Sequence, residues 1–272
     1  MNKKRNRIIL IVDLSDGSNH LVDFGFHLST MINAEIVVVH QVIKMFPTMT
    51  EKAYRDMIFQ IEIDEAKAKL RELTQGRRHE SIIVSSDPIL DILAEMQSSH
   101  YTDWVVGGLK KSSLMKRIFF GSTFIKIINN TNLLTVAVPI SNVISVPEKI
   151  LVAVTHKYSL NEFHLKNLLS NFKEKAKKVE FFTILNEGED EETAREYLLQ
   201  LQGKYSMCDP TIVLLKGGDK YNELKKFVEQ SGHSFLVLQE GSRSLIDELF
   251  RKYMVNELIH AGDIPLIVLP NE

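Results

Sequence analysis

Cysteine and tryptophan each occur once in the 272 residues, and hydrophobic runs are short. With Cys208 as its only cysteine, the chain forms no intrachain disulfide and no zinc site of several cysteines. The apolar run that follows the basic residues 1–7 comprises only Ile8–Val12. This run is too short for the apolar core of a secretion signal and for a membrane span. We therefore expect a protein of the reducing cytoplasm that does not enter a membrane.

A large excess of charge of one sign is also missing, because 33 Lys and Arg against 35 Asp and Glu give a formal net charge of −2. Nucleic-acid-binding proteins usually carry a strong basic excess, so we expect no nucleic-acid partner. The nine histidines include no close pair with metal-ligand spacing. The sequence also lacks a G-x-S-x-G elbow and a G-x-x-x-x-G-K-[ST] loop. We predict no metal site and no catalytic residues.

Short β-branched runs alternate with longer segments of helical periodicity. In the first half, strands are predicted at Ile8–Val12, Glu35–Val42, Ser81–Ser85, Trp104–Val106 and Leu133–Val138. In the second half, they are predicted at Ile150–Val154, Val179–Leu185, Thr211–Leu215, Phe235–Leu238 and Leu266–Leu269. This alternation is typical of crossover connections and a parallel sheet. Because many of the runs are apolar on both faces, the strands should be covered by helices on both sides. The pattern predicts an α/β fold.

The second half repeats the order of the first, and both halves close with similar phrases, TNLLTVAVP and GDIPLIVLP. Each copy holds five strands, enough to bury its own sheet, so the repeat predicts two similar domains rather than a solenoid. Residues 140–148 are flanked by Pro139 and Pro147 and are typical of a short linker. We place the domains at residues 1–140 and 148–272.

Two loops of the first copy are candidates for ligand binding, because ligands of parallel α/β sheets bind beyond the carboxyl ends of the strands. One follows the first strand at Asp13. The other, from Gly107 to Thr123, precedes the helix predicted at Ser122–Asn130 and carries several basic residues and no acidic one. A helix start attracts phosphate through its unpaired N–H groups and its dipole. A Gly-Ser-Thr sequence is also good helix-capping chemistry that needs no ligand, and the residues alone leave both readings open.

The spacing of these residues resembles the universal stress protein family in its tandem two-domain form. The family signature is G-x-x-G, nine residues, then Gly followed by Ser or Thr. Gly108 and Gly121-Ser122 keep that spacing, and Lys111 stands where the second glycine should be. The strand-one aspartate of the form V-D-x-S is present as Val12-Asp13-Leu14-Ser15, and Val38–Val42 resembles the phrase at the end of the family's second strand.

The resemblance implies two tandem open five-stranded sheets of strand order 3-2-1-4-5 with helices on both faces, an adenine nucleotide alpha-hydrolase-like fold. Fifth strands of this family pair across a two-fold axis. In a tandem chain that pairing implies an intramolecular pseudo-dimer of the two domains, and a homodimer is the other arrangement left open. The second copy departs from the signature: Thr155 replaces the aspartate, Gln239 replaces Gly108, and Lys252-Tyr253 replace Gly121-Ser122. We therefore expect no ATP binding of the family kind in this copy.

For function, the resemblance implies a stress-response protein that binds ATP or a related nucleotide in the first domain without catalysis and acts through contacts with an unknown protein partner. The nucleotide-binding residues implied are Val12, Asp13, His40, Val42, Gly107, Gly108, Lys111, Gly121, Ser122 and Thr123. The alternative is a ligand-free interaction or scaffold protein whose site has decayed, which Lys111 favours. A phosphohydrolase or nucleotidyl-transferring enzyme is the third hypothesis. It would need a general base and a metal-binding carboxylate near the phosphates, and Asp13 is the only evident acid.

Overall fold

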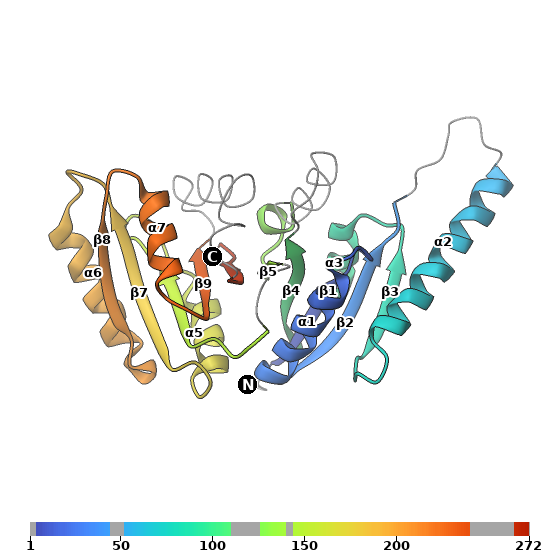
Figure 1. Ribbon diagram of the computed structural model, residues 1–272, viewed down its shortest axis with the longest axis horizontal. Helices are drawn as coiled ribbons and strands as arrows, with labels where there is room; N and C mark the ends of the chain where they lie inside the picture. Colours follow the sequence, from blue (N-terminus) through green and yellow to red (C-terminus); the bar gives the residue numbers. More distant parts are fainter. Residues whose placement is uncertain (1–3, 44–51, 110–125, 140–143, 240–263, 272) are drawn as a thin grey trace. The chain divides into compact units, whose positions relative to one another are not determined.

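The computed structural model describes residues 4–43, 52–109, 126–139, 144–239 and 264–271 (Figure 1). The chain forms two compact units, Met1–Gly108 and Leu109–Glu272. None of the described helices is long and apolar enough to cross a membrane.

The first unit contains four parallel strands in the order β3-β2-β1-β4. The strands are β1 (Arg5–Ile11), β2 (Ala34–Gln41), β3 (Ser81–Ser85) and β4 (Tyr101–Leu109). The helices are α1 (Ser18–Ile32), α2 (Lys52–Leu73) and α3 (Ile89–Met96). Right-handed crossovers place α1 and α2 on one face and α3 on the other, and Figure 1 shows α1 in front of the strands and α3 behind them. An ion pair between Asp23 in α1 and Arg77, just after α2, agrees with this placement.

The core of the first unit includes β1 and β4, whose side chains are covered on both faces. Ile8, Ile9 and Leu10 of β1 are fully buried, as are Trp104 and Val105 of β4. This burial explains why the runs are apolar at consecutive positions rather than at alternate ones.

Glycine lets α1 lie directly on the central strand. A Cβ atom built on Gly25 would come within 2.8 Å of Leu10 Cδ1, so a side chain at this position would push the helix away from β1. The helix ends at Asn33, which adopts the left-handed conformation with φ of 50°. Asparagine accepts this conformation more readily than most residues, and α1 therefore stops there.

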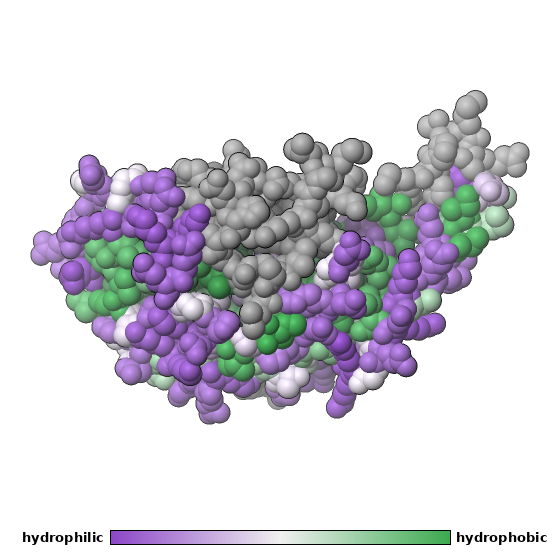
Figure 2. All heavy atoms as spheres, in the orientation of Figure 1, coloured by the Kyte–Doolittle hydropathy of each residue, from purple (hydrophilic) through white to green (hydrophobic). Residues whose placement is uncertain are grey.

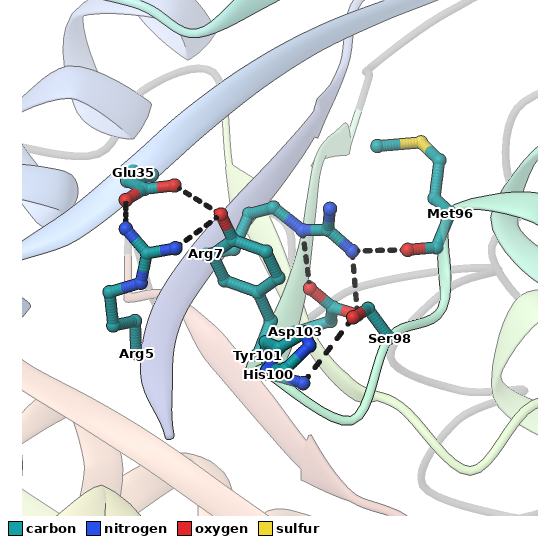
Figure 3. A network of polar contacts seen from close by, with 8 residues as sticks. All are labelled: Arg5, Arg7, Glu35, Met96, Ser98, His100, Tyr101 and Asp103. Carbon is teal, nitrogen blue, oxygen red and sulfur yellow. Dashed lines mark hydrogen bonds and ion pairs between the residues drawn. The ribbon is translucent and has the colours of Figure 1, made fainter. Parts of the chain in front are cut away.

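A polar network holds the amino ends of β1, β2 and β4 together (Figure 3). The Arg7 guanidinium donates to Asp103 Oδ1 at 2.7 Å and Oδ2 at 3.1 Å, and it also donates to the carbonyl of Met96. The same guanidinium lies 4.3 Å from the centre of the Tyr101 ring. Burial lowers the pKa of Arg7, but the hydrogen bonds and charge of Asp103 outweigh it and raise the pKa above its ordinary value. The guanidinium therefore keeps its charge, and its hydrogen bonds to Asp103 fix β1 against β4.

The second unit contains six described strands in the order β5-β10-β9-β6-β7-β8. The strands are β5 (Leu134–Pro139), β6 (Lys149–Ala153), β7 (Lys178–Leu185), β8 (Thr211–Lys216), β9 (Ser234–Gln239) and β10 (Leu266–Leu269). The helices are α5 (Glu162–Phe172), α6 (Glu191–Lys204), the 3-10 turn η1 (Ser206–Cys208) and α7 (Lys220–Glu229). Read from β8 to β10, the order is the 3-2-1-4-5 predicted for one copy. β10 also pairs antiparallel with β5, the fifth strand of the first copy.

Asn161 ties the start of α5 to the end of the chain. Its side-chain oxygen accepts a hydrogen bond from the backbone N–H of His164 at 3.1 Å, which caps the helix. Its amide nitrogen donates to the carbonyls of Pro270 and Asn271, each at 3.1 Å. The buried Asn161 side chain thus makes hydrogen bonds both to the start of α5 and to the segment after β10.

Three sequence predictions need correction or completion. Gly107 and Gly108, predicted to open a loop, lie within β4, because the ladder to β1 continues to the pair Ile11 and Gly107. Arg7, counted with the basic N-terminus, is buried by its pairing with Asp103. The helical spacing of Ile61, Ala66 and Leu70 in the sequence predicts one apolar face of α2, but Ile61 is half exposed and only Ala66 and Leu70 are buried. The helical periodicity of Ser244–Ala261 predicts a further helix, and this segment lies outside the described residues.

Candidate functional site

The turn after β1 fixes the carboxylate of Asp13. Its Oδ1 accepts hydrogen bonds from the Ser15 backbone N–H at 3.2 Å and the Ser15 hydroxyl at 2.7 Å. The Ser18 hydroxyl lies 3.3 Å from the same oxygen. Leu14, which lies between Asp13 and Ser15, has a positive φ of 56°, a conformation that costs energy for a residue with a Cβ atom. The V-D-x-S pattern therefore has a local reason: the serine holds the aspartate that the turn presents.

His40 lies beside this turn, at the carboxyl end of β2. Its Nδ1 is 2.7 Å from the carbonyl oxygen of Val12, and the Val12 N–H donates to the carbonyl of Val39 at 2.9 Å. Both backbone polar groups of Val12 are thus used within the protein. The imidazole is half buried, and its contact with Val12 braces β2 against β1.

Val42 continues the same edge beyond β2. Its N–H donates to the Ser85 carbonyl at 2.8 Å, and its side chain is buried. The Ser85 hydroxyl in turn donates to Asp87 Oδ2 at 2.6 Å. These contacts fix the backbone of His40–Val42, the segment that the family resemblance places near the adenine and the ribose.

Neither the backbone conformation nor the described contacts of Gly108 explain why this position is a glycine. Its φ is not in the left-handed region, and an added Cβ would meet only Leu21, at an ordinary distance of 3.5 Å. A glycine kept where neither the backbone conformation nor the neighbours require it is consistent with a close approach by a group outside these contacts. Gly107 precedes it in β4, opposite Ile11 of β1.

The structure thus brings six of the predicted residues to one edge of one sheet. Val12, Asp13, His40, Val42, Gly107 and Gly108 lie at or just beyond the carboxyl ends of β1, β2 and β4. This is the edge at which parallel α/β sheets bind ligands. The other four predicted residues, Lys111, Gly121, Ser122 and Thr123, lie outside the described residues. Among the described residues no group of three or more His, Cys, Asp or Glu is placed to hold a metal ion.

Comparison with known proteins decides the family. The family model described as the universal stress protein family matches residues 4–139, half of the chain. This chain belongs to the universal stress protein family. No curated protein sequence matches it significantly.

Solved structures of low sequence identity show the same fold over the full length. A universal stress protein from Archaeoglobus fulgidus matches with a TM-score of 0.72 at 14% identity, covering 99% of this chain and 100% of its own. A functionally unknown protein from Pseudomonas aeruginosa matches with a TM-score of 0.60 at 12% identity, covering 98% and 92%. The cytoplasmic domain of a prokaryotic cation chloride cotransporter matches with a TM-score of 0.57 at 12% identity, covering 98% and 96%.

The pairing register of the strands shows which residues of the second unit of this universal stress protein correspond to the site residues of the first. Val12 donates its N–H to Val39, and Val154 donates its N–H to Phe182 at the same 2.9 Å. Counting along the paired strands, Thr155 takes the place of Asp13. By the same count, Thr183 takes the place of His40 and Gln239 that of Gly108. The replacement of Gly108 by Gln239, predicted from the sequence, holds in the register of the strands.

The corresponding edge of the second unit contains a pocket that the sequence did not predict. About 550 Å³ of empty space, its open mouth included, lies beyond β6 and between β7 and β9. Thr155, Thr183 and Gln239 line it, together with Tyr158 from the loop after β6 and Tyr197 from α6. Its only sign in the sequence is that the second copy lacks the aspartate and the glycine of the family signature. The pocket itself depends on side chains that are distant in the chain.

Proposed function

We propose that the first domain binds ATP or a related adenine nucleotide without catalysis, and that the bound nucleotide alters contacts with an unidentified partner protein. The observation that carries this proposal is Gly108. It lies on the ligand-binding edge of the sheet, close to the Asp13 turn, and neither its backbone conformation nor its described neighbours require a glycine. Membership of the family supports the choice of ligand.

In this proposal, each group of site residues contacts a different part of the nucleotide. The Asp13 carboxylate accepts hydrogen bonds from hydroxyl or amino groups of the ligand, and the fixed backbone of His40–Val42 borders the base and sugar. Gly107 and Gly108 leave room for phosphate, and Lys111 with Gly121-Ser122-Thr123 supplies charge, N–H groups and hydroxyls to it. Asp13 is a poor general base, because its Oδ1 is already engaged by Ser15 and Ser18.

We further propose that residues 148–272 are a second copy of the family domain without the nucleotide site. The strand order β8-β7-β6-β9-β10 and the register equivalences support a common origin of the two copies. The antiparallel pair of β5 and β10 is the pairing that a tandem form of the family would make within one chain. The loss of aspartate at Thr155 and of glycine at Gln239 supports the absence of nucleotide binding in this copy.

Isothermal titration calorimetry with ATP tests the nucleotide site. We expect the wild-type chain to bind ATP and Gly108→Val to weaken binding at least about tenfold, which corresponds to about 1.4 kcal/mol. Gly218→Val is the matched control, because Gly218 is exposed and an added Cβ there meets nothing within 4 Å. Equal affinities of Gly108→Val and the wild type would show that the nucleotide does not approach β4.

The ligand-free scaffold is the second candidate, favoured by Lys111 at a glycine position of the family signature. The same titration separates the two functions. A wild-type chain that binds no ATP, together with binding gained by Lys111→Gly, identifies a decayed site and a scaffold. Binding in the wild type that is lost in Gly121→Leu supports the nucleotide sensor. Release of phosphate from ATP with repeated turnover would instead establish an enzyme.

A further inference from the structure

The pocket of the second unit has an apolar floor. Phe182, Leu224 and Leu238 form it, and each is at most 2% exposed. The floor is rigid, since the Phe182 ring packs against Phe227 with 4.9 Å between ring centres. The 550 Å³ counts open space at the mouth, so the floor encloses only part of it. A ligand of one or two rings has the size and the apolar surface that match this space.

Two tyrosines supply aromatic walls. Tyr158 is 38% exposed at the mouth, and Tyr197 is half buried. Burial, and then the charge of Glu162, raise the pKa of the Tyr197 phenol, so it stays neutral at ordinary pH. Thr155, Ser159 and Thr183, each of which carries a hydroxyl group, also line the pocket. Aromatic faces with a few hydroxyl groups favour a planar ring with one polar substituent.

Charge is absent from the lining. None of the thirteen described residues that line the pocket is charged. Lys157, which precedes the lining tyrosine of the loop, pairs with Glu189 at 2.6 Å, and Lys220 pairs with the same carboxylate at 2.9 Å. These two cations are thus already committed to a carboxylate. A phosphate in the pocket would lose water without gaining a partner of opposite charge, which is unfavourable.

Gln239 closes the side on which the first copy has Gly108. Its Oε1 accepts from the Asn161 N–H at 2.8 Å, and its Nε2 donates to the Pro270 carbonyl at 2.9 Å. The amide is therefore held by the backbone. The position that has no side chain in the first copy, Gly108, carries a fixed side chain in the second.

We propose that the second unit binds an uncharged organic compound of one or two rings, with a hydroxyl or carbonyl substituent, in the pocket at the carboxyl ends of β6, β7 and β9. The apolar floor holds the ring, the hydroxyls orient its substituent, and the lack of charge among the described lining residues selects against anions. This site is independent of the proposed nucleotide site in the first unit.

Fluorescence of 6-propionyl-2-(dimethylamino)naphthalene, an uncharged two-ring probe with a carbonyl substituent that brightens in apolar surroundings, tests the proposal on the full chain. We expect saturable binding to the wild type and at least a tenfold weaker affinity in Ser159→Trp, which places an indole at the mouth. Ser159 is exposed, so the change leaves the fold intact. The matched control is Ser170→Trp on the exposed side of α5, which should bind the probe like the wild type.

A second arm tests the electrostatic argument by competition. Naphthol should displace the probe at a concentration at least tenfold lower than naphthyl phosphate, which has the same ring system and two negative charges. Equal displacement by the phosphate would overturn the selection against anions, and with it the proposal.

A third arm excludes an exposed apolar patch on α2. Tyr54, Met57 and Ile61 of α2 are each at least half exposed, and Figure 2 shows hydrophobic residues at the surface over the first half of this helix. The proposal requires probe binding to persist in Met57→Glu. It fails if the wild type gives no saturable signal, if Ser159→Trp binds normally, or if Met57→Glu alone abolishes the signal.

Discussion

Replacing Asp103 by alanine should destabilise the first unit strongly, because it leaves the Arg7 guanidinium buried without its carboxylate. The two residues are only 6% and 7% exposed, and they are register partners across β4 and β1. Removing one partner of a buried ion pair costs about 3–5 kcal/mol. Arg7 would keep the Met96 carbonyl and the Tyr101 ring. We therefore expect a loss near the lower limit, about 3 kcal/mol in the free energy of unfolding.

Two further variants separate the charge from the packing. Asp103→Asn keeps one acceptor for the guanidinium and should cost less, about 1–2 kcal/mol. The double variant Arg7→Met with Asp103→Leu removes both charges and fills the site with apolar atoms. It should recover much of the stability that Asp103→Ala loses, because no unpaired charge remains buried.

Trp104 provides the assay. It is the only tryptophan of the chain, it is fully buried in β4, and it adjoins Asp103. Urea unfolding followed by its fluorescence therefore reports on the first unit. Lys177→Ala is the control, because it breaks an ion pair that lies in solvent. The Lys177 and Glu148 side chains of that pair are 76% and 48% exposed. An Asp103→Ala variant that unfolds at the same urea concentration as the control would refute the reasoning.

Three other changes have defined outcomes. Hydrogen bonds from Lys157, Lys220 and a backbone N–H outweigh burial and lower the pKa of Glu189 to about 2. The second unit should therefore lose stability as the pH falls from the ordinary glutamate value toward that pKa, and Glu189→Gln should flatten this part of an acid unfolding curve followed by circular dichroism. Asn161→Ala removes a helix cap and a bridge to the end of the chain and should cost about 1–3 kcal/mol in urea unfolding followed by circular dichroism. Gly25→Val should cost about 1–3 kcal/mol through the clash with Leu10, whereas Gly203→Ala, with nothing within 4 Å of its Cβ, should stabilise α6 by up to about 1 kcal/mol in the same assay.

The strands were predictable because their signal is local. Consecutive β-branched residues such as Ile8–Val12 mark a strand buried on both faces, and the alternation with helical segments indicates parallel pairing. Ser81–Ser85 and Leu266–Leu269 coincide with β3 and β10 residue for residue. The order of the second sheet came from the family resemblance, since no local pattern specifies which strands are neighbours.

The candidate site was predictable only in part. Asp13, His40 and Gly108 meet at one edge as expected, because strand ends in a parallel sheet share that edge. The burial of Arg7 was not foreseen, since a basic residue near a chain end gives no sign of a partner far along the sequence. The pocket of the second unit was missed for the same reason, as Tyr158 and Leu224 come from separate segments that only the fold brings together.

Photolabelling with azido-ATP followed by peptide mapping tests the central claim most directly. The account predicts that the label appears in peptides from residues 4–139, that excess ATP prevents it, and that Gly108→Val reduces it while Gly218→Val does not. Label confined to residues 148–272, or label that excess ATP fails to prevent, would contradict the claim that the first domain binds the nucleotide.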